Sequence, residues 1–252
     1  MRTAQKAQNS RLYSVAITVG LIAYGVVHLL IAWIALQLAW GKSSEQADQQ
    51  GALQELASKP FGGFLLWVVA IGMFALVIWK ALELAYGHLD TEKKVSSAGR
   101  AVIYLALSIS AARVAMGSGG GQQKGMTAKL MESGPGRILI VVVGLVIIGV
   151  GIRQLYKSYT KKFTEDLTGG VSDSTILLGR LGYAAKGVAF LVVGGLFAVA
   201  AINYDPEKTG GLDTALRTLK EQPFGSVLLT LMALGIACFG VYCFVWSRNA
   251  KK

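Results

Sequence analysis

The stretch LASKPFGG, residues 56–63, places a proline and two glycines directly before a long apolar run. A related stretch, TLKEQPFGS, occupies residues 218–226, and a weaker version, LMESGPGR, occupies residues 130–137. Proline disfavours the α conformation in the residue before it and fits the first turn of a new helix. Each stretch therefore predicts a point where the chain ends one helix and begins another.

The residues at these steps have a structural role in our interpretation. The rings of Phe61 and Phe224 are expected to lie at the membrane interface, and the glycine that follows each ring allows neighbouring backbones to approach closely. The middle step moves its proline by one position and lacks the phenylalanine. We interpret the following residues as structural breaks rather than ligands: Pro60, Phe61, Gly62, Pro135, Gly136, Pro223, Phe224 and Gly225.

The composition is that of a membrane protein. Of 252 residues, 53% are hydrophobic and only 15% are charged, whereas about 25% are charged in a typical soluble domain. The net charge is +11, but the basic residues lie mostly at the ends of apolar segments, where they meet lipid headgroups. We therefore expect no binding of nucleic acid. The two cysteines, Cys238 and Cys243, are expected to be small buried hydrophobes.

Six segments are apolar and long enough to cross a bilayer, which takes about 20 helical residues. They lie near residues 13–40, 62–86, 99–117, 136–156, 176–203 and 224–247. The first is too long for the core of a signal peptide, so we expect a retained transmembrane helix. The sequence thus predicts an all-α integral membrane protein with one membrane domain over residues 1–252.

The basic residues also predict the orientation of the chain. With the N-terminus inside, the inner side carries 15 lysines and arginines and the outer side 9, and Lys186 within a helix completes the 25. Cytoplasmic loops carry the excess of basic residues. Both termini are therefore expected to be cytoplasmic.

An internal repeat organises the six segments. Three stretches of 18 residues align without gaps, namely Tyr24–Gly41, Arg100–Gly117 and Lys186–Asn203. Each is followed by a polar loop and then by one of the proline and glycine steps, in which Gly62, Gly136 and Gly225 are equivalent.

The loops of the first and third units contain leucines at three-residue spacing with charges between them (Leu53 and Leu56; Leu216 and Leu219), which predicts a short amphipathic helix in the unit. The repeating unit, helix, amphipathic helix and helix, is expected over residues 13–87, 93–163 and 174–248. Parallel repeats are related by an axis along the membrane normal. We therefore predict a pseudo-threefold axis, with Leu56, Leu130 and Leu219 at one depth near the outer interface.

These features resemble an uncharacterised family of bacterial membrane proteins, a domain of unknown function built from three tandem two-helix units. The resemblance rests on the threefold repeat, on the PFG steps, and on the basic residue that opens the shared helix at Arg100 and Lys186. It covers nearly the whole chain after about residue 11 and implies a bacterial plasma membrane. It implies no activity and no catalytic residues, and Tyr24 in the first repeat departs from the basic pattern.

Ionisable residues inside membrane segments are functional candidates by default. His28 aligns with Tyr104 and Phe190, and the other histidine, His88, lies beyond the end of its segment, so a hydrogen bond to a neighbouring helix is favoured over a metal or haem ligand. Glu83 follows Lys80 by three residues, which places both on one helix face. That spacing favours a local ion pair over a proton relay.

Basic residues recur at equivalent inner positions of the second and third repeats. We predict that they contact an anionic lipid or ligand at the inner leaflet, against the simpler alternative that they only extend toward the headgroups. These residues are Lys94, Arg100, Arg180 and Lys186.

No catalytic constellation, metal cluster or cofactor motif is evident in the sequence, so we expect no enzyme activity and no cofactor. The leading hypothesis is a non-enzymatic accessory, scaffold or lipid-binding subunit, with membrane lipids and other membrane subunits of a larger complex as partners. The alternative is a small-solute transporter or channel with a path along the pseudo-threefold axis, which a polar axial cavity would favour. A redox subunit with a cofactor is a third hypothesis, which rests on His28 alone.

Overall fold

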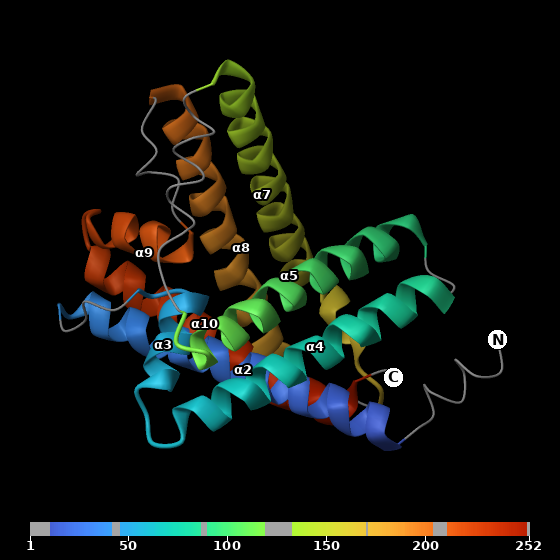
Figure 1. Ribbon diagram of the computed structural model, residues 1–252. Helices are drawn as coiled ribbons and strands as arrows, with labels where there is room; N and C mark the ends of the chain where they lie inside the picture. Colours follow the sequence, from blue (N-terminus) through green and yellow to red (C-terminus); the bar gives the residue numbers. More distant parts are fainter. Residues whose placement is uncertain are drawn as a thin grey trace.

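The computed structural model describes residues 11–41, 46–86, 90–118, 133–169, 171–203 and 211–250, and this part of the chain is almost entirely helical (Figure 1). Its long helices are α2 (Arg11–Ala39), α4 (Gly62–Tyr86), α5 (Thr91–Ala115), α7 (Gly134–Thr160), α8 (Asp173–Asn203) and α10 (Gly225–Asn249). Each of these 6 helices is long and apolar enough to cross a membrane. The expected all-α architecture with six spanning helices is confirmed.

Two shorter helices occupy the loops between the long helices of the first and third units, as the repeat predicted. They are α3 (Gln49–Ala57) and α9 (Leu212–Lys220). Both bury their apolar side against the bundle, since Leu53 and Leu216 are each 1% exposed. The corresponding loop of the middle unit, with Leu130, lies outside the described residues.

The proline and glycine steps are the points where the second helix of each unit begins. Phe61 and Phe224 adopt left-handed backbone conformations, with φ of 62° and 59°, and both rings are 84% exposed. The glycine after each ring packs on carbonyl oxygens at the end of the preceding short helix, so a side chain would not fit there. At the start of α7, the Ser133 hydroxyl instead accepts a hydrogen bond from the Gly136 amide at 3.1 Å.

The third spanning helix is longer than the hydropathy of its sequence predicted. α5 begins at Thr91, whereas the apolar segment was expected from residue 99. The additional turns carry Lys93 and Lys94, both of which are exposed. Hydropathy marks the apolar part of a helix, and a polar first turn outside that part leaves no such signal.

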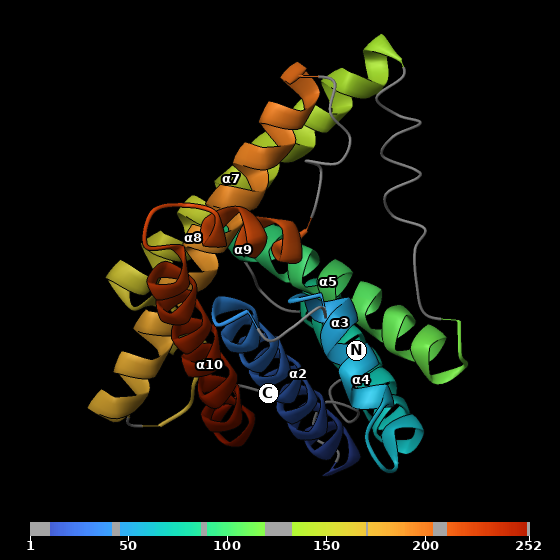
Figure 2. The same ribbon diagram turned by 90° about the vertical axis from the view of Figure 1, so that its left-hand side faces the viewer.

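The repeats pack in a cyclic order. The second helix of each unit lies against the first helix of the next, so that α4 packs on α5, α7 on α8, and α10 on α2 (Figures 1 and 2). The last of these pairs joins the third unit back to the first. Such closure is the pairing pattern that three equivalent units around an axis require.

Equivalent residues meet in these pairs. In α7 and α8, a Cβ on Gly151 would lie 2.9 Å from the carbonyl oxygen of Gly187; in α2 and α10, a Cβ on Gly25 would lie 2.8 Å from that of Gly240. Gly25 and Gly187 directly follow the aligned residues Tyr24 and Lys186, and Gly151 and Gly240 lie at the same position in their helices. The repeat therefore determines which backbones come into contact.

A second set of equivalent residues supports the same register. A Cβ on Gly144 of α7 would lie 3.0 Å from the carbonyl oxygen of Gly194 in α8. At the equivalent place between α4 and α5, the Ser108 hydroxyl donates to the carbonyl oxygen of Ala70 at 2.9 Å. The three helix pairs thus share one register. The α4–α5 pair has a hydrogen bond at the position where the α7–α8 pair has two glycines.

The tilts of the helices do not share this symmetry. The pair α7 and α8 stands at a steep angle to α2, α4 and α10, and α5 diverges from α7 (Figures 1 and 2). Within the first and third units the two long helices pack on each other, as α2 does on α4 and α8 on α10. The middle unit is the most open part of the described bundle.

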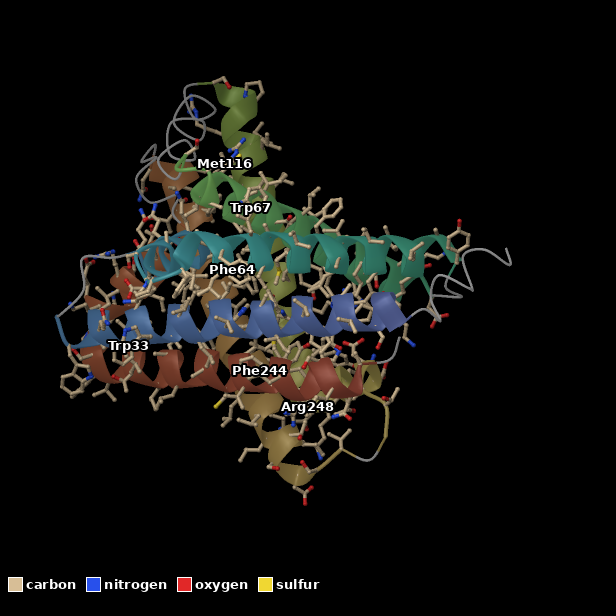
Figure 3. The ribbon with its side chains drawn as sticks, turned by 60° about the horizontal axis from the view of Figure 1, so that its bottom comes forward. Trp33, Phe64, Trp67, Met116, Phe244 and Arg248 are labelled. Atoms are coloured by element: carbon tan, nitrogen blue, oxygen red, sulfur yellow. The ribbon has the colours of Figure 1, made fainter. Side chains whose placement is uncertain are left out.

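Large apolar side chains cover the outside of the bundle, as expected for a surface in lipid. Trp33 is 55% exposed, Phe64 69% and Trp67 45%; the first lies on α2 and the other two on α4 (Figure 3).

The predicted orientation is testable by cysteine labelling in a variant that lacks the two native cysteines. Lys59, in the exposed turn after α3, is expected outside, and the exposed Asn249, at the end of α10, inside. A membrane-impermeant maleimide should therefore label Lys59→Cys in intact cells and Asn249→Cys only after permeabilisation. The reverse pattern would show that both termini lie outside.

The role of close backbone contact is testable within one helix. Gly151→Ala introduces a methyl group into the contact between α7 and α8, which should destabilise the fold by about 1–3 kcal/mol. The matched control is Gly149→Ala, where a Cβ meets nothing within 4 Å and where alanine is favoured over glycine by about 1 kcal/mol. Thermal unfolding in detergent should rank Gly149→Ala above wild type and Gly151→Ala below it; equal values for both variants would contradict the interpretation.

Candidate functional site

The two long helices of the middle unit, α5 and α7, are separated at a level where the two long helices of each other unit are in contact. In the first unit, a Cβ on Gly20 would lie 2.6 Å from Cγ of Leu76; in the third, one on Gly182 would lie 2.7 Å from Cβ of Phe239. The repeat places Ser96 at the position of these glycines. The middle unit thus carries a side chain at a contact where its neighbours carry none.

A cavity of about 330 Å³ lies between the separated helices, and Ser96 lines it. Val146 and Val150 of α7 line it as well. Val150 is the equivalent of Leu76 and Phe239, and Val146 occupies the position at which the other units have Gly72 and Gly235. The residues that close the first and third units are therefore replaced in the middle unit by residues that line its cavity.

The aligned residues that open the shared helices meet at this cavity. Tyr24, Arg100 and Lys186 come from three different units, and all three line it. The Lys186 ammonium donates a hydrogen bond to the Tyr24 hydroxyl at 3.1 Å. We call these three residues the axial layer, since each unit contributes its equivalent residue.

Within the axial layer, Lys186 is surrounded by neutral groups. Its Nζ lies 3.4 Å from Nε2 of His28 and 3.8 Å from the centre of the Phe239 ring. Nδ1 of His28 lies 2.8 Å from the Tyr24 carbonyl oxygen, which only accepts, so this geometry assigns the ring proton to Nδ1 and the lone pair to Nε2. No carboxylate among the described residues forms an ion pair with Lys186.

Arg100, by contrast, has a carboxylate partner. Its Nη2 donates to Oδ2 of Asp166 at 2.8 Å. Asp166 ends η1 (Lys162–Asp166), a short 3-10 helix between the second and third units. Because Phe163 of η1 is fully buried and stacks on Tyr183, with ring centres 5.2 Å apart, this segment packs on the bundle beside the C-terminal end of α10.

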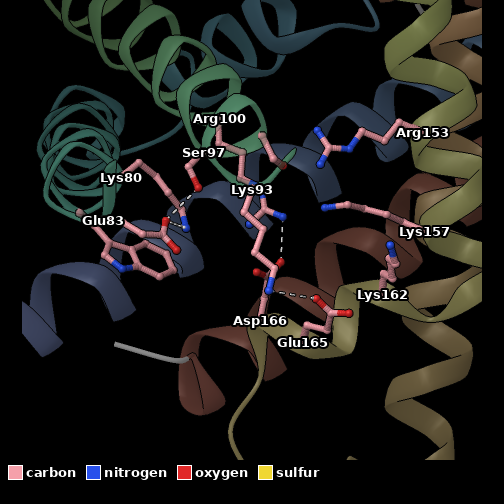
Figure 4. A pocket seen from close by; sticks show the side chains of 12 residues that line it. Lys80, Glu83, Lys93, Ser97, Arg100, Arg153, Lys157, Lys162, Glu165 and Asp166 are labelled. Atoms are coloured by element: carbon pink, nitrogen blue, oxygen red, sulfur yellow. Dashed lines mark hydrogen bonds and ion pairs between the residues drawn. The ribbon is translucent and has the colours of Figure 1, made fainter. Parts of the chain in front are cut away.

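A second cavity, of about 370 Å³, adjoins the first and shares Ser96, Arg100, Arg153 and Lys157 with it. Arg153 and Lys157 extend from α7 toward Arg100 (Figure 4). Basic side chains dominate its lining: Lys80, Lys93, Arg100, Arg153, Lys157 and Lys162, against Glu83, Glu165 and Asp166.

Helix packing fixes the relative depth of these groups. Because Gly151 of α7 meets Gly187 of the antiparallel α8, Lys186 is level with residue 152, and Arg153 lies one residue farther inward. Lys157 lies five residues inward of that level, which is about 7.5 Å at 1.5 Å per residue. The basic groups therefore extend over more than one helical turn along the cavity.

Trp246 contributes its ring to the wall of the first cavity. The side chain is 2% exposed, and its Nε1 has no acceptor among the described residues. Buried donors normally have partners. Because Nε1 itself is fully buried, this N–H group is not presented to the cavity.

The environment of Asp166 shifts its acidity. Burial alone would raise the pKa of this carboxyl, but the charge of Arg100 and its hydrogen bond more than offset burial, so the pKa lies below the ordinary value. Asp166 is therefore ionised at neutral pH and holds Arg100 by charge.

The four basic residues predicted to contact an anion divide into two groups. Arg100 and Lys186 line one cavity, whereas Lys94 and Arg180 are exposed and line neither cavity. Lys94 and Arg180 each lie six residues before Arg100 and Lys186, and side chains six residues apart on a helix project in clearly different directions. For this reason the four residues do not form one site, although they occupy equivalent positions in two repeats. Arg153, Lys157 and Asp166 were not singled out by sequence analysis, because basic residues at inner helix ends are common in membrane proteins.

The two polar residues predicted inside the membrane both lie near this site. His28 is buried beside Lys186, and Glu83 accepts hydrogen bonds from Lys80 at 2.6 Å and from Ser97 at 3.0 Å. In the described part of the chain, no cluster of three or more His, Cys, Asp or Glu residues could hold a metal ion.

Comparison with known proteins adds a family but no activity. The sequence matches the family described as Domain of Unknown Function (DUF1206) three times, over residues 19–87, 95–161 and 181–250. It is 29% identical over 237 residues to the uncharacterized protein YxxB of Bacillus subtilis (strain 168), an alignment that covers 88% of this chain and 86% of that protein. No solved structure matches it significantly. No enzyme family is indicated by these matches.

The contribution of Asp166 is testable by removing its charge. Asp166→Asn leaves Arg100 without a carboxylate, and the loss of a hydrogen bond between charged groups should lower the free energy of unfolding by about 1.5–3 kcal/mol. The control is Glu165→Gln, whose partner Lys93 is 3.9 Å away with both side chains more than half exposed, and which should cost less than about 1 kcal/mol.

The same pair predicts a pH dependence. Because the folded-state pKa of Asp166 is depressed, its stabilising contribution is present above the unfolded-state pKa and is lost as the pH falls through the folded-state value. Denaturant unfolding over the acidic range should therefore show a loss in wild type that is reduced in Asp166→Asn. Identical acid profiles, or equal effects of the two variants at neutral pH, would contradict this role.

Proposed function

The chain belongs to the DUF1206 family, and from its site we propose that it is a membrane protein that binds an anionic amphiphile. The headgroup occupies the basic cavities, and the hydrocarbon chain lies in the opening between α5 and α7. The observation that carries this proposal is the charge of the lining: the two cavities together present seven basic and three acidic side chains, an excess of four positive charges. Basic pockets between membrane helices on the cytoplasmic side bind anionic headgroups.

The opening between α5 and α7 provides a place for the hydrocarbon chain. Its apolar lining includes Val95 and Ile103 of α5 and Val146 and Val150 of α7. These side chains are 64%, 43%, 61% and 38% exposed, respectively, so the gap is continuous with the outer, lipid-facing surface of the bundle. An amphiphile that enters from the membrane would keep its chain in an apolar environment while its headgroup reaches the charges.

Binding without catalysis agrees with the groups that are present. Besides apolar side chains, the cavity residues are cations, aromatic rings, hydroxyls and the amides of Gln49 and Gln154. The carboxylates among them are in ion pairs with Lys80, Lys93 and Arg100. We therefore propose a non-enzymatic lipid-binding role in the plasma membrane of a bacterium, with both termini cytoplasmic. Such a protein would serve as an accessory subunit for other membrane proteins.

Transport along the axis is the second candidate, because the polar axial layer lines a cavity. The first cavity reaches the start of α3, where Gln49 lines it, but Leu53 of α3 and Leu216 of α9, each 1% exposed, line neither cavity. A path across the membrane would have to displace these helices. For this reason we favour binding over passage.

The proposal is testable by measuring the phosphatidylglycerol retained after purification in a mild detergent. Arg153→Gln with Lys157→Gln removes two cavity charges, and each charge near an anionic surface contributes about 1 kcal/mol. Apparent affinity should therefore fall about 30-fold, since 1.4 kcal/mol corresponds to a factor of ten. Native mass spectrometry and lipid extraction would report the bound fraction.

Two further variants serve as controls. Lys94→Gln with Arg180→Gln removes the same charge at exposed inner positions outside the cavities and should leave retention almost unchanged. Ser96→Gly with Val146→Gly removes no charge but restores the glycines of the other units, and should reduce retention by closing the gap. Equal retention by wild type and the Arg153/Lys157 variant would overturn the proposal; movement of phosphatidylglycerol between leaflets of proteoliposomes would favour transport.

A further inference from the structure

The axial layer holds a cation that no carboxylate of the described residues compensates, and tyrosine hydroxyls reach the same end of the first cavity. Resting on the proposed function, we infer that this end of the cavity binds the carboxylate of a single-chain fatty acid, whose hydrocarbon chain lies in the opening between α5 and α7.

Lys186 supplies the positive charge of this site. Its described partners are the Tyr24 hydroxyl, Nε2 of His28 and the Phe239 ring, at 3.1, 3.4 and 3.8 Å from its Nζ. None of these groups carries a negative charge. Because a charge inside the membrane is costly unless it is paired or faces a polar cavity, an anionic group beside Lys186 would stabilise its ammonium.

The other cations that line the first cavity already have partners. Arg100 forms an ion pair with Asp166 at 2.8 Å, and Arg153 and Lys157 are also engaged in interactions. Lys186 is therefore the cation to which we assign the bound anion, and a group with one negative charge compensates it.

Tyrosine hydroxyls add neutral hydrogen-bond donors. Tyr104 and Tyr183 line the first cavity and are only 2% and 4% exposed. Their hydroxyls form no hydrogen bond within the described part of the chain, and neither oxygen is among the fully buried atoms that lack a partner there. The small accessible part of each side chain thus includes its hydroxyl, which faces the cavity and is free to donate to a ligand.

Ring contacts place these hydroxyls in the same cluster as Lys186. The Tyr104 ring centre lies 5.4 Å from that of Tyr24, whose hydroxyl accepts from Lys186 and keeps its own proton to donate. The Tyr183 ring centre lies 5.4 Å from that of Phe239, the ring that Nζ of Lys186 contacts. An ionised carboxylate accepts about four hydrogen bonds through its two oxygens, which matches one ammonium and three hydroxyls.

The rest of the lining favours a fatty acid over a phospholipid at this end of the cavity. Ile103, Phe190 and Phe239 lie beside the polar groups, and their side chains offer no hydrogen-bond donor. A phospholipid brings glycerol and ester oxygens with its phosphate, and polar atoms buried without a hydrogen bond are costly. A fatty acid has no polar atom beyond its carboxylate, so its chain meets only apolar side chains.

The experiment compares ligands of equal chain length and different headgroup. Palmitate, hexadecyl phosphate and hexadecanol are added as radiolabelled ligands to the purified protein in a mild detergent, and equilibrium dialysis against empty micelles gives each affinity. Hexadecanol should bind at least about tenfold more weakly than palmitate, since a hydrogen bond to a charged group contributes about 1.5–3 kcal/mol. Hexadecyl phosphate should also bind more weakly, because a phosphate monoester carries more than one negative charge at neutral pH.

Two variants assign palmitate to the axial end of the cavity. Lys186→Gln should weaken palmitate at least about tenfold and leave hexadecanol unchanged, because only the carboxylate uses the ammonium. Tyr104→Phe removes one neutral donor and should weaken palmitate about 2- to 10-fold, which corresponds to about 0.5–1.5 kcal/mol. Because the Tyr104 hydroxyl has no partner among the described residues, this variant should not lower the thermal stability of the ligand-free protein.

Tyr242→Phe is the matched control. It removes a hydroxyl from the same aromatic cluster, but this hydroxyl donates to the Phe163 carbonyl oxygen at 3.1 Å, and Tyr242 lines neither cavity. The control should therefore lower thermal stability and leave the affinity for palmitate unchanged. If Lys186→Gln fails to fold, the comparison of Tyr104→Phe with Tyr242→Phe decides the outcome.

The outcomes separate this inference from the proposed function. Equal affinity for hexadecanol and palmitate, or a loss of palmitate affinity that is the same in Tyr104→Phe and Tyr242→Phe, would overturn the carboxylate site. Tighter binding of hexadecyl phosphate than of palmitate would also overturn it, while the binding of an anionic amphiphile stands. Failure of palmitate, hexadecyl phosphate and phosphatidylglycerol to bind wild type would overturn the proposed function itself.

Discussion

Close contact between helix backbones is the constraint on which the rest of this structure depends. In lipid, helices gain little from burying apolar side chains against one another, so their association relies on packing and on small residues that let backbones meet. Gly151 with Gly187 and Gly25 with Gly240 meet this requirement at equivalent places in two of the three unit interfaces. The cyclic order of the helices follows from these contacts, because each unit presents the same surfaces to its neighbours.

The candidate site arises where this constraint is relaxed. Gly20 and Gly182 close the first and third units, and the middle unit has Ser96 instead. Ser96 and Val146 thus carry side chains where the other units have glycines, and both line the cavity between α5 and α7. This gap reaches the axial layer from the lipid side. The open interface of the middle unit thus coincides with positions at which its sequence differs from the other two repeats.

Sequence patterns predicted the parts of this arrangement that repeat. The six spanning helices, the helix breaks and the equivalence of Arg100 and Lys186 follow from periodicity and alignment, because each unit obeys the same packing rules. The site depends instead on differences between units. Arg153 and Lys157 resemble ordinary basic residues at an inner helix end, and Asp166 belongs to a connection that occurs once. A comparison of Gly20, Ser96 and Gly182 across the alignment would have shown that the middle unit differs. The structure is needed to show that the two glycines lie at helix contacts, so that a side chain at this position matters.

Electrostatics explains why the units could not remain identical at the axial layer. Three basic residues at Tyr24, Arg100 and Lys186 would place three like charges together within the membrane, where repulsion is weakly screened. The chain instead has a neutral tyrosine in the first unit and an arginine neutralised by Asp166 in the second. Only Lys186 keeps a charge that no carboxylate of the described residues compensates. The divergence of the repeats therefore concentrates one positive charge at the back of the one cavity that α5 and α7 leave open.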